Sequence, residues 1–129
     1  ARAAADATAD VCPVSAHREA HEATITAALR IMETRYAQNV RVEEIARAVF
    51  LSPDRFTEVF VQGVGRTPRD YLRYLRVEKA KALLSQSAAP PMTQVAHESG
   101  FGDAAYFARA FRAATGQSPS EWRKRFVMR

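Results

Sequence analysis

The segment QVAHESGFGDAAYFARAFRAATGQSPSEWR, residues 94–123, contains the pattern that decides the fold. Apolar residues recur at helical spacing on either side of a glycine turn, and Asp103 is placed to cap the second helix. Phe107 and Phe111, four residues apart, form one apolar face of that helix. Residues 118–121, Ser-Pro-Ser-Glu, then combine an N-cap, a first-turn proline and capping-box spacing. The segment predicts two short helices joined by a tight turn, followed by a third helix.

The same pattern occurs once earlier in the chain, around the segment LSPDRFTEVF at residues 51–60, where Ser52 is placed to cap a helix and Pro53 fits its first position. Phe56 and Phe60 precede Phe107 and Phe111 by 51 residues. At the same offset, the glycine, cap, proline, acidic and aromatic positions correspond: Gly65, Thr67, Pro68, Asp70 and Tyr71 with Gly116, Ser118, Pro119, Glu121 and Trp122. Ile45-Ala46 precede Val95-Ala96 by 50 residues, so the turn of the second copy is one residue longer. The chain is therefore predicted to contain a duplicated helical unit.

These patterns predict an all-α fold with seven helices, in which a long linker helix joins two helix-turn-helix subdomains. The expected helices cover residues 24–38, 42–49, 53–64, 68–85, 92–99 and 104–115, and a last one starts at 119. The expected organisation is a flexible linker or tail at 1–22, a first subdomain at 23–66, the linker helix at 67–86 and a second subdomain at 87–129. Because the chain opens with Ala1 rather than Met, we expect a fragment of a longer protein.

Composition narrows the class of protein. Nineteen Lys and Arg against fourteen Asp and Glu give a formal net charge of +5, which favours an anionic partner. A single cysteine excludes an intrachain disulfide and suits a reducing compartment. No apolar run approaches the roughly 20 residues that a membrane span needs. We therefore expect an intracellular protein that does not span a membrane.

The basic residues gather in particular segments. On the linker helix and at the C-terminus they are Arg66, Arg69, Arg73, Arg76, Lys79, Lys81, Arg123, Lys124, Arg125 and Arg129, and Arg109 and Arg112 lie near the sixth helix. Phosphates would follow these positions if both units bound one duplex. The alternative is a helical bundle whose repeat serves packing alone and whose charges are a solvated face. Taken as a set, the positions favour double-stranded DNA as the partner.

Residues 94–123 resemble the signature of AraC/XylS-type transcriptional regulators. The matching positions are Val95-Ala96, Gly100-Phe101, Phe107, Phe111, Gly116, Ser118-Pro119 and Trp122-Arg123. YLRYLRVEKAKALL, residues 71–84, resembles the linker helix of that family, including Arg76. The resemblance implies a seven-helix DNA-binding domain of a transcription regulator, C-terminal to a sensor or dimerisation domain. It also implies that the protein acts in the bacterial cytoplasm, associated with the nucleoid.

The resemblance also implies roles for individual residues. Two recognition helices would contact bases in successive major-groove segments, through Arg55, Thr57 and Glu58 in the first and Ala105, Tyr106 and Arg109 in the second. Phosphate contacts are expected from Ser52, Arg66, Arg69, Arg73, Thr93, Arg112 and Lys124. Arg109 has two open interpretations: it reads guanine, the commonest specific contact of arginine, or it holds a phosphate.

Two features depart from the family pattern. Phe50 stands in the first turn, where the family commonly has glycine, and we expect an ordinary α or β conformation with its ring in the core. The first recognition helix carries Asp54 and Glu58, although phosphates repel carboxylates. Asp54 is explained by the positive end of the helix dipole. Glu58 requires either a cytosine amino group or a pair with Arg55, so the first unit should bind more weakly than the second or demand cytosine.

Other functions have weaker support. Cys12, His17 and His21 suggest zinc, but a structural site needs four ligands and the chain has no second cysteine, so we expect no metal and no cofactor. We find no phosphate-binding glycine loop, acid–base pair or nucleophile pair, and we expect no enzyme. The competing hypothesis is a helical interaction module whose first unit meets RNA polymerase or a sensor domain.

Overall fold

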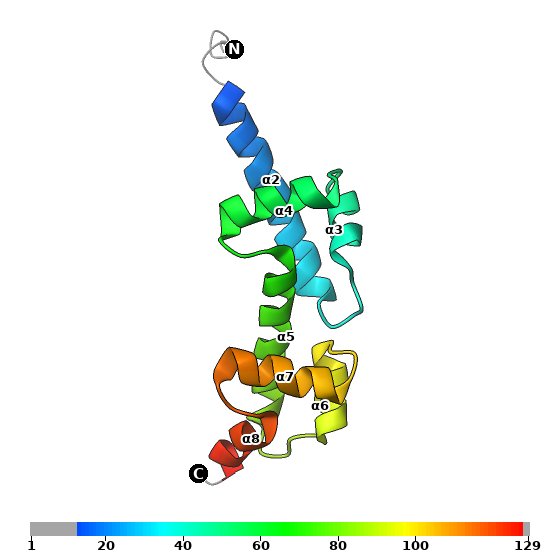
Figure 1. Ribbon diagram of the computed structural model, residues 1–129, viewed down its shortest axis with the longest axis vertical. Coiled ribbons are helices and arrows are strands. Elements are labelled where there is room, and N and C mark those ends of the chain that lie inside the picture. The colour runs from blue at the N-terminus through cyan, green and yellow to red at the C-terminus, as the bar shows by residue number, and fades with distance from the viewer. Residues whose placement is uncertain (1–12, 128–129) are drawn as a thin grey trace.

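The computed structural model describes residues 13–127. This part of the chain forms seven helices and no strand, arranged as an elongated molecule (Figure 1). The helices are α2 (Pro13–Arg35), α3 (Val42–Ala48), α4 (Pro53–Val64), α5 (Pro68–Leu84), α6 (Met92–Ser99), α7 (Ala104–Thr115) and α8 (Pro119–Val127). The predicted fold class is confirmed for the described residues, and α4, α6 and α7 begin and end where the sequence predicts.

The first helix is much longer than predicted. It begins at Pro13 rather than at residue 24 and ends at Arg35, so residues 13–22, expected as flexible linker, are helical. Proline at a first helical position followed by alanine and glutamate favours a helix even where no apolar face is present. The expectation of a linker at residues 1–12, and with it Cys12, lies outside the described residues.

Side-chain oxygens cap the N-termini of the helices, as the sequence predicts. Ser52 Oγ accepts the backbone N–H of Arg55 at 3.2 Å, at the start of α4. At the start of α7, Asp103 Oδ1 accepts the N–H of Tyr106 at 2.7 Å. Each oxygen satisfies a backbone donor that the first turn of a helix leaves without a partner. Thr67 plays this part at α5, and Ser118 with Glu121 forms the reciprocal capping box at α8.

The duplication is visible in the aromatic packing. Phe56 and Phe60 on α4 have ring centroids 5.6 Å apart, and Phe60 meets Tyr71 of α5 edge-on at 5.8 Å. The equivalent contacts of the second copy are Phe107 with Phe111 at 5.7 Å and Phe111 with Trp122 at 5.7 Å. Tilted and edge-on pairs are the favoured arrangements of aromatic rings. Each copy therefore builds its own core around the same three aromatic positions.

The two cores share α5. Leu72, near the start of α5, is buried in the first core together with Met32, Ile45 and the Phe56–Phe60 pair. From Val77 onward α5 contributes to the second core instead, through Val77, Ala80, Leu83 and Leu84. A helix of 17 residues is about 25 Å long. The predicted linker helix thus acts as a rigid rod with one subdomain packed at each end.

Phe50 contradicts its prediction. Its φ is 64°, in the left-handed region, and its side chain is 92% exposed, so the ring is outside the core. The same turn recurs at Gly100, with φ of 96°: Phe50 N–H bonds Arg47 O as Gly100 N–H bonds His97 O. The geometry of the repeated turn outweighs the preference of phenylalanine for negative φ. The strained conformation is sterically possible because the side chain extends into open solvent.

We predict that Phe50→Gly raises the free energy of unfolding by roughly 0.5–1 kcal/mol, because glycine removes the left-handed strain and an exposed ring gives up little burial. Phe50→Ala is the matched control: it removes the ring, keeps the strain and should stay near the original stability. Urea denaturation followed by circular dichroism measures both. A glycine variant less stable than the alanine variant would contradict this account of the turn.

Candidate nucleic-acid interface

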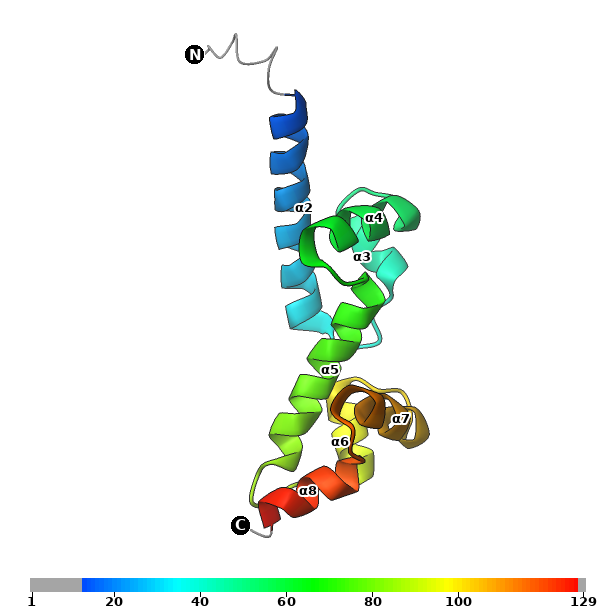
Figure 2. The same ribbon diagram turned by 60° about the vertical axis from the view of Figure 1, so that its left-hand side comes forward.

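The two predicted recognition helices lie on the same side of the molecule. In Figure 1, α4 and α7 run across the long axis, one above the other, and in Figure 2 both lie on one side of α5 while α2 lies on the other. Each follows a shorter helix, α3 or α6, and a tight turn. The arrangement presents two equivalent helices to one elongated partner.

On α4, part of the polar surface is satisfied internally. Arg55 pairs with Glu58 at 3.2 Å, as the sequence predicts, and its guanidinium also lies 3.4 Å from His21 Nε2 of α2. Thr57 is half-buried, and its hydroxyl donates to Pro53 O at 2.9 Å. Arg55 and Glu58 are exposed, whereas Thr57 is turned back toward its own helix. Any partner of α4 must therefore compete with contacts that already exist.

The surface of α7 is different in character. Ala105 and Arg109 are exposed, and the alanines at 104, 105 and 108 leave the helix backbone open to close approach. Tyr106 is 38% exposed and its ring packs edge-on against Phe101 at 5.6 Å. Within the described part of the chain, Arg109 has no ion pair or hydrogen bond. Its guanidinium is therefore available to an anionic or base-edge acceptor.

The repeat places opposite charges at equivalent positions. At the offset of 51 that relates Phe56 to Phe107, Glu58 corresponds to Arg109. At the offset of 50 that holds earlier in the unit, Glu43 and Glu44 correspond to Thr93 and Gln94. Glu44 is engaged in the cap of α3, where it accepts Arg41 N–H at 2.9 Å. The first unit thus presents a more acidic surface than the second.

The predicted phosphate-contacting residues are all at least partly exposed, but several have partners within the chain. Arg66 lies 4.7 Å from the centroid of the Tyr74 ring, and Arg73 pairs with Asp70 at 2.7 Å. Arg112 lies 3.9 Å from the Glu121 carboxylate, an exposed pair that contributes little. The others are Ser52 at the start of α4, Arg69 on α5, Thr93 in the first turn of α6 and Lys124 on α8. Helix α8, which carries Lys124, lies at one end of the molecule in Figure 1.

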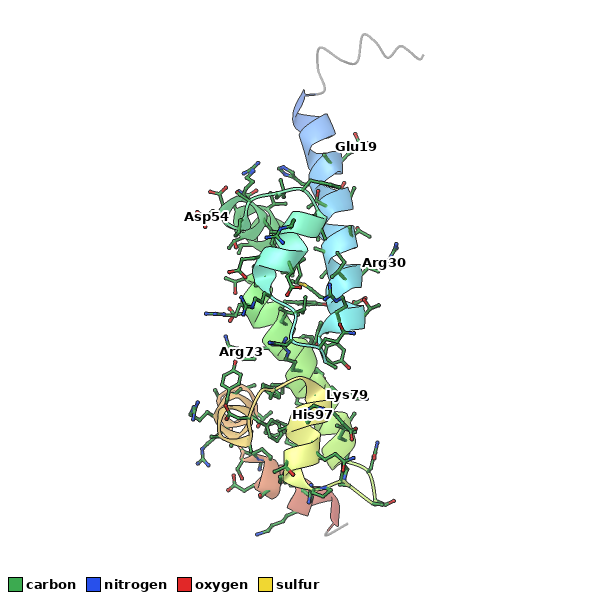
Figure 3. All side chains as sticks on the ribbon, turned by 90° about the vertical axis from the view of Figure 1, so that its right-hand side faces the viewer. Glu19, Arg30, Asp54, Arg73, Lys79 and His97 are labelled. Atoms are coloured by element: carbon green, nitrogen blue, oxygen red, sulfur yellow. The ribbon has the colours of Figure 1, made fainter. Side chains whose placement is uncertain are left out.

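Between the two units lies a basic cleft of about 580 Å³. Its charged and aromatic lining consists of Arg41, Glu43, Arg69, Arg73, Arg76 and Tyr106. Figure 3 shows Arg73 projecting from α5 between the units, on the side that also carries Asp54 of α4. Arg41 was absent from the predicted contacts because it precedes α3 in the sequence, far from the linker helix that it faces. The cleft gathers positive charge midway between α4 and α7.

Two arginines of the predicted basic set hold backbone carbonyls of their own chain. Arg76 is half-buried and donates from Nε to Tyr36 O at 2.8 Å, and burial lowers its pKa. Arg123 is likewise half-buried and donates to Pro90 O, which holds α8 against the loop before α6. Counting basic residues along the sequence could not distinguish these structural arginines from exposed ones, because both occur at helical spacing.

Among residues 13–127, no three His, Cys, Asp or Glu side chains come together as metal ligands would. Of the three residues that suggested zinc, Cys12 and the side chain of His17 lie outside the described part. None of the helices in that part is long and apolar enough to cross a membrane.

Comparison with known proteins agrees with this architecture. The model of a helix-turn-helix domain family matches residues 45–125. The HTH-type transcriptional regulator YijO of Escherichia coli is 36% identical over 95 residues, which are 74% of this chain and 33% of that protein. The arabinose operon regulatory protein of Escherichia coli is 39% identical over 85 residues, 66% of this chain and 29% of that protein. The chain thus spans about a third of the length of these curated relatives.

Solved structures show the same fold. A transcriptional regulator from Chromobacterium violaceum, described as having an AraC-type DNA-binding domain, superposes with a TM-score of 0.73 and 25% identity, covering 82% of this chain and 94% of that one. The DNA-binding domain of AdpA, solved with a target DNA, gives a TM-score of 0.76 at 23% identity, over 81% and 93% of the two chains. The chain belongs to the AraC-type helix-turn-helix family.

Proposed function

We propose that the chain binds double-stranded DNA as the DNA-binding part of a bacterial transcription regulator, with α4 and α7 in two successive major-groove segments. The observation that carries this proposal is the pair of equivalent helices on one side of α5 with a basic cleft between them. Successive major-groove segments on one face of a duplex are about 34 Å apart. The cleft would then face the phosphates that lie between the two segments.

Direct base contacts are proposed for the two recognition helices with unequal weight. On α7, Arg109 reads a base edge, while Tyr106 and Ala105 contact the groove floor at close approach. On α4, the proposed base contacts come from Arg55, Thr57 and Glu58. Arg55 and Glu58 are already paired with each other at 3.2 Å. A contact that replaces an existing pair yields less net free energy. The second unit therefore supplies most of the sequence preference.

Phosphate contacts are proposed for the basic and capping residues around both helices. Arg69 and Arg73 hold the backbone that crosses the cleft, and Arg41 joins them there. The remaining proposed contacts are Ser52, Arg66, Thr93, Arg112 and Lys124. Together they would provide the sequence-independent, salt-sensitive part of the affinity.

The partners beyond DNA are proposed from the length of the relatives. Since the aligned part is about a third of each, we propose an N-terminal sensor or dimerisation domain in the intact protein, and action in the cytoplasm on the nucleoid. Nothing in the proposal requires a catalytic step or a cofactor.

A second candidate function rests on Phe50. Its exposed ring lies beside Leu51 and Pro53, an apolar spot that Glu43 and Arg47 border. An exposed apolar patch bordered by polar residues is typical of a protein contact. In this alternative the first unit meets RNA polymerase or the sensor domain. Arg73→Glu distinguishes the two functions: only a DNA binder loses affinity for a duplex, while Arg30→Glu, on the opposite side in Figure 3, serves as its control.

We predict that Arg109→Ala weakens binding to a preferred duplex by about 1–3 kcal/mol and weakens binding to unrelated duplexes much less, because the guanidinium reads a base. Arg112→Ala on the same helix is the control: it should weaken all duplexes equally and reduce the salt slope by about 1. Fluorescence anisotropy at several salt concentrations measures both. An equal loss on every duplex for Arg109→Ala would assign that residue to a phosphate instead.

We further predict that Glu58→Gln strengthens binding to unrelated duplexes by roughly 0.3–1 kcal/mol, because it removes a carboxylate near phosphates and releases Arg55. Glu19→Gln on α2, on the opposite side from Asp54 and Arg73 in Figure 3, makes the same change of net charge and should have little effect. Equal affinities for the Glu58 variant and the original protein would show that Glu58 points away from bound DNA.

A further inference from the structure

The two subdomains make little contact with each other except through α5. Their buried cores are separate clusters, and the extensive helix packing occurs within one unit or against α5. A shared rod alone leaves each unit able to rock about its attachment. The relative position of α4 and α7 therefore depends on whatever contact joins the units beside the rod.

Such a contact exists at the C-terminal end of α2. Arg76 on α5 donates from Nε to Tyr36 O at 2.8 Å, and a terminal nitrogen of the same guanidinium reaches Gln38 O at 3.4 Å. A cation is favoured at this end of a helix, where carbonyl groups lack intrahelical partners. One side chain thus ties the end of the first unit's longest helix to the middle of α5.

The second unit contacts the same C-terminal end of α2 through Gly100. A Cβ atom on this glycine would lie 2.4 Å from Tyr36 O and 2.9 Å from Ala37 Cα, and 3.1 Å from Arg76 Nε. The backbone of the second turn therefore rests directly on the end of α2 and on the arginine that holds it. We call Arg76, Gly100 and the backbone of residues 36–38 the joint.

The packing within either unit does not explain why a glycine and a half-buried arginine stand at the joint. Gly65 and Gly116 adopt the same left-handed conformation, yet a Cβ on either would meet nothing within 4 Å. Phe50, at the position equivalent to Gly100, even carries a large side chain in that conformation. Lack of space at the end of α2 therefore distinguishes Gly100. The hydrogen bonds that the structure describes for the half-buried Arg76 go to the carbonyls of Tyr36 and Gln38 in the first unit.

We propose that the joint fixes the separation and rotation of α4 relative to α7, and thereby sets the half-site spacing that the protein accepts. This inference rests on the proposed function, in which both helices read one duplex. Inserting one base pair moves a half-site by about 3.4 Å and turns it by about 35°. A rigid joint cannot follow that movement, so the duplex must deform.

The test is a series of duplexes that differ only in the number of base pairs between the half-sites. The original 129-residue chain should prefer one spacing by about tenfold or more, because the other spacings force bending or twisting of the DNA. Arg76→Met keeps the aliphatic stem and removes every donor, and should reduce that preference to about threefold or less. Gly100→Ala places a Cβ atom against the backbone at the end of α2, and should flatten the spacing preference or move it to another spacing.

Each variant has a matched control. Arg73→Met makes the same change three residues earlier on α5, and should weaken all spacings equally. Gly116→Ala imposes the same backbone strain where there is space, and should keep the original profile. Thermal unfolding followed by circular dichroism identifies any variant that fails to fold, and the other variant of the joint then decides the test.

A measurement without DNA separates this inference from the proposed function. Spin labels at Gln62→Cys and Ala113→Cys, exposed and equivalent positions on α4 and α7, report the distance between the units once Cys12 is replaced by serine. Arg76→Met should broaden the distance distribution and Arg73→Met should not. Unchanged distributions and spacing profiles in both joint variants would overturn the inference, whereas an original protein that binds no duplex would overturn the proposed function.

Discussion

The arrangement of this molecule depends on the division of one helix between two hydrophobic cores. Leu72 is buried in the first core and Val77 in the second, one and a half turns later on α5. Because a packed helix of this length does not bend at little cost, each core determines where the other can lie. The end of α2, held by Arg76 and pressed by Gly100, removes rotational freedom that the rod alone would leave.

Duplication gave the two units the same framework and different surfaces. The aromatic triads match within about 0.1 Å in centroid distance, which reflects the volume constraint on a small core. Exposed positions carry no such constraint: Glu58 stands where the second unit has Arg109, and Phe50 where it has Gly100. The first unit, more acidic than the second, is thus compatible with a protein that places most base recognition in α7 and orients α4 through the framework.

The sequence predicted the elements that local chemistry determines. Asp103, Ser52 and the glycines marked helix ends correctly, because caps and left-handed residues act over a single turn. The Arg55–Glu58 pair was predicted for the same reason. Prediction was wrong for the early start of α2, which a first-turn proline favours, and for Phe50, whose conformation follows the geometry of the repeated turn. It was also wrong for the burial of Arg76 and Arg123, which contacts with distant parts of the chain decide. The contribution of Arg41 to the cleft depends on the same tertiary contacts, which periodicity does not encode.

The most direct test of the account is binding-site selection from a random duplex library with the 129-residue chain. The account predicts a two-part motif with its halves about one helical turn apart, a stronger preference in the half read by α7, and cytosine enriched in the other half where Glu58 lies. A single enriched half would contradict base reading by α4. Selection without any enriched sequence would contradict the central claim that two helices on one rod read one duplex.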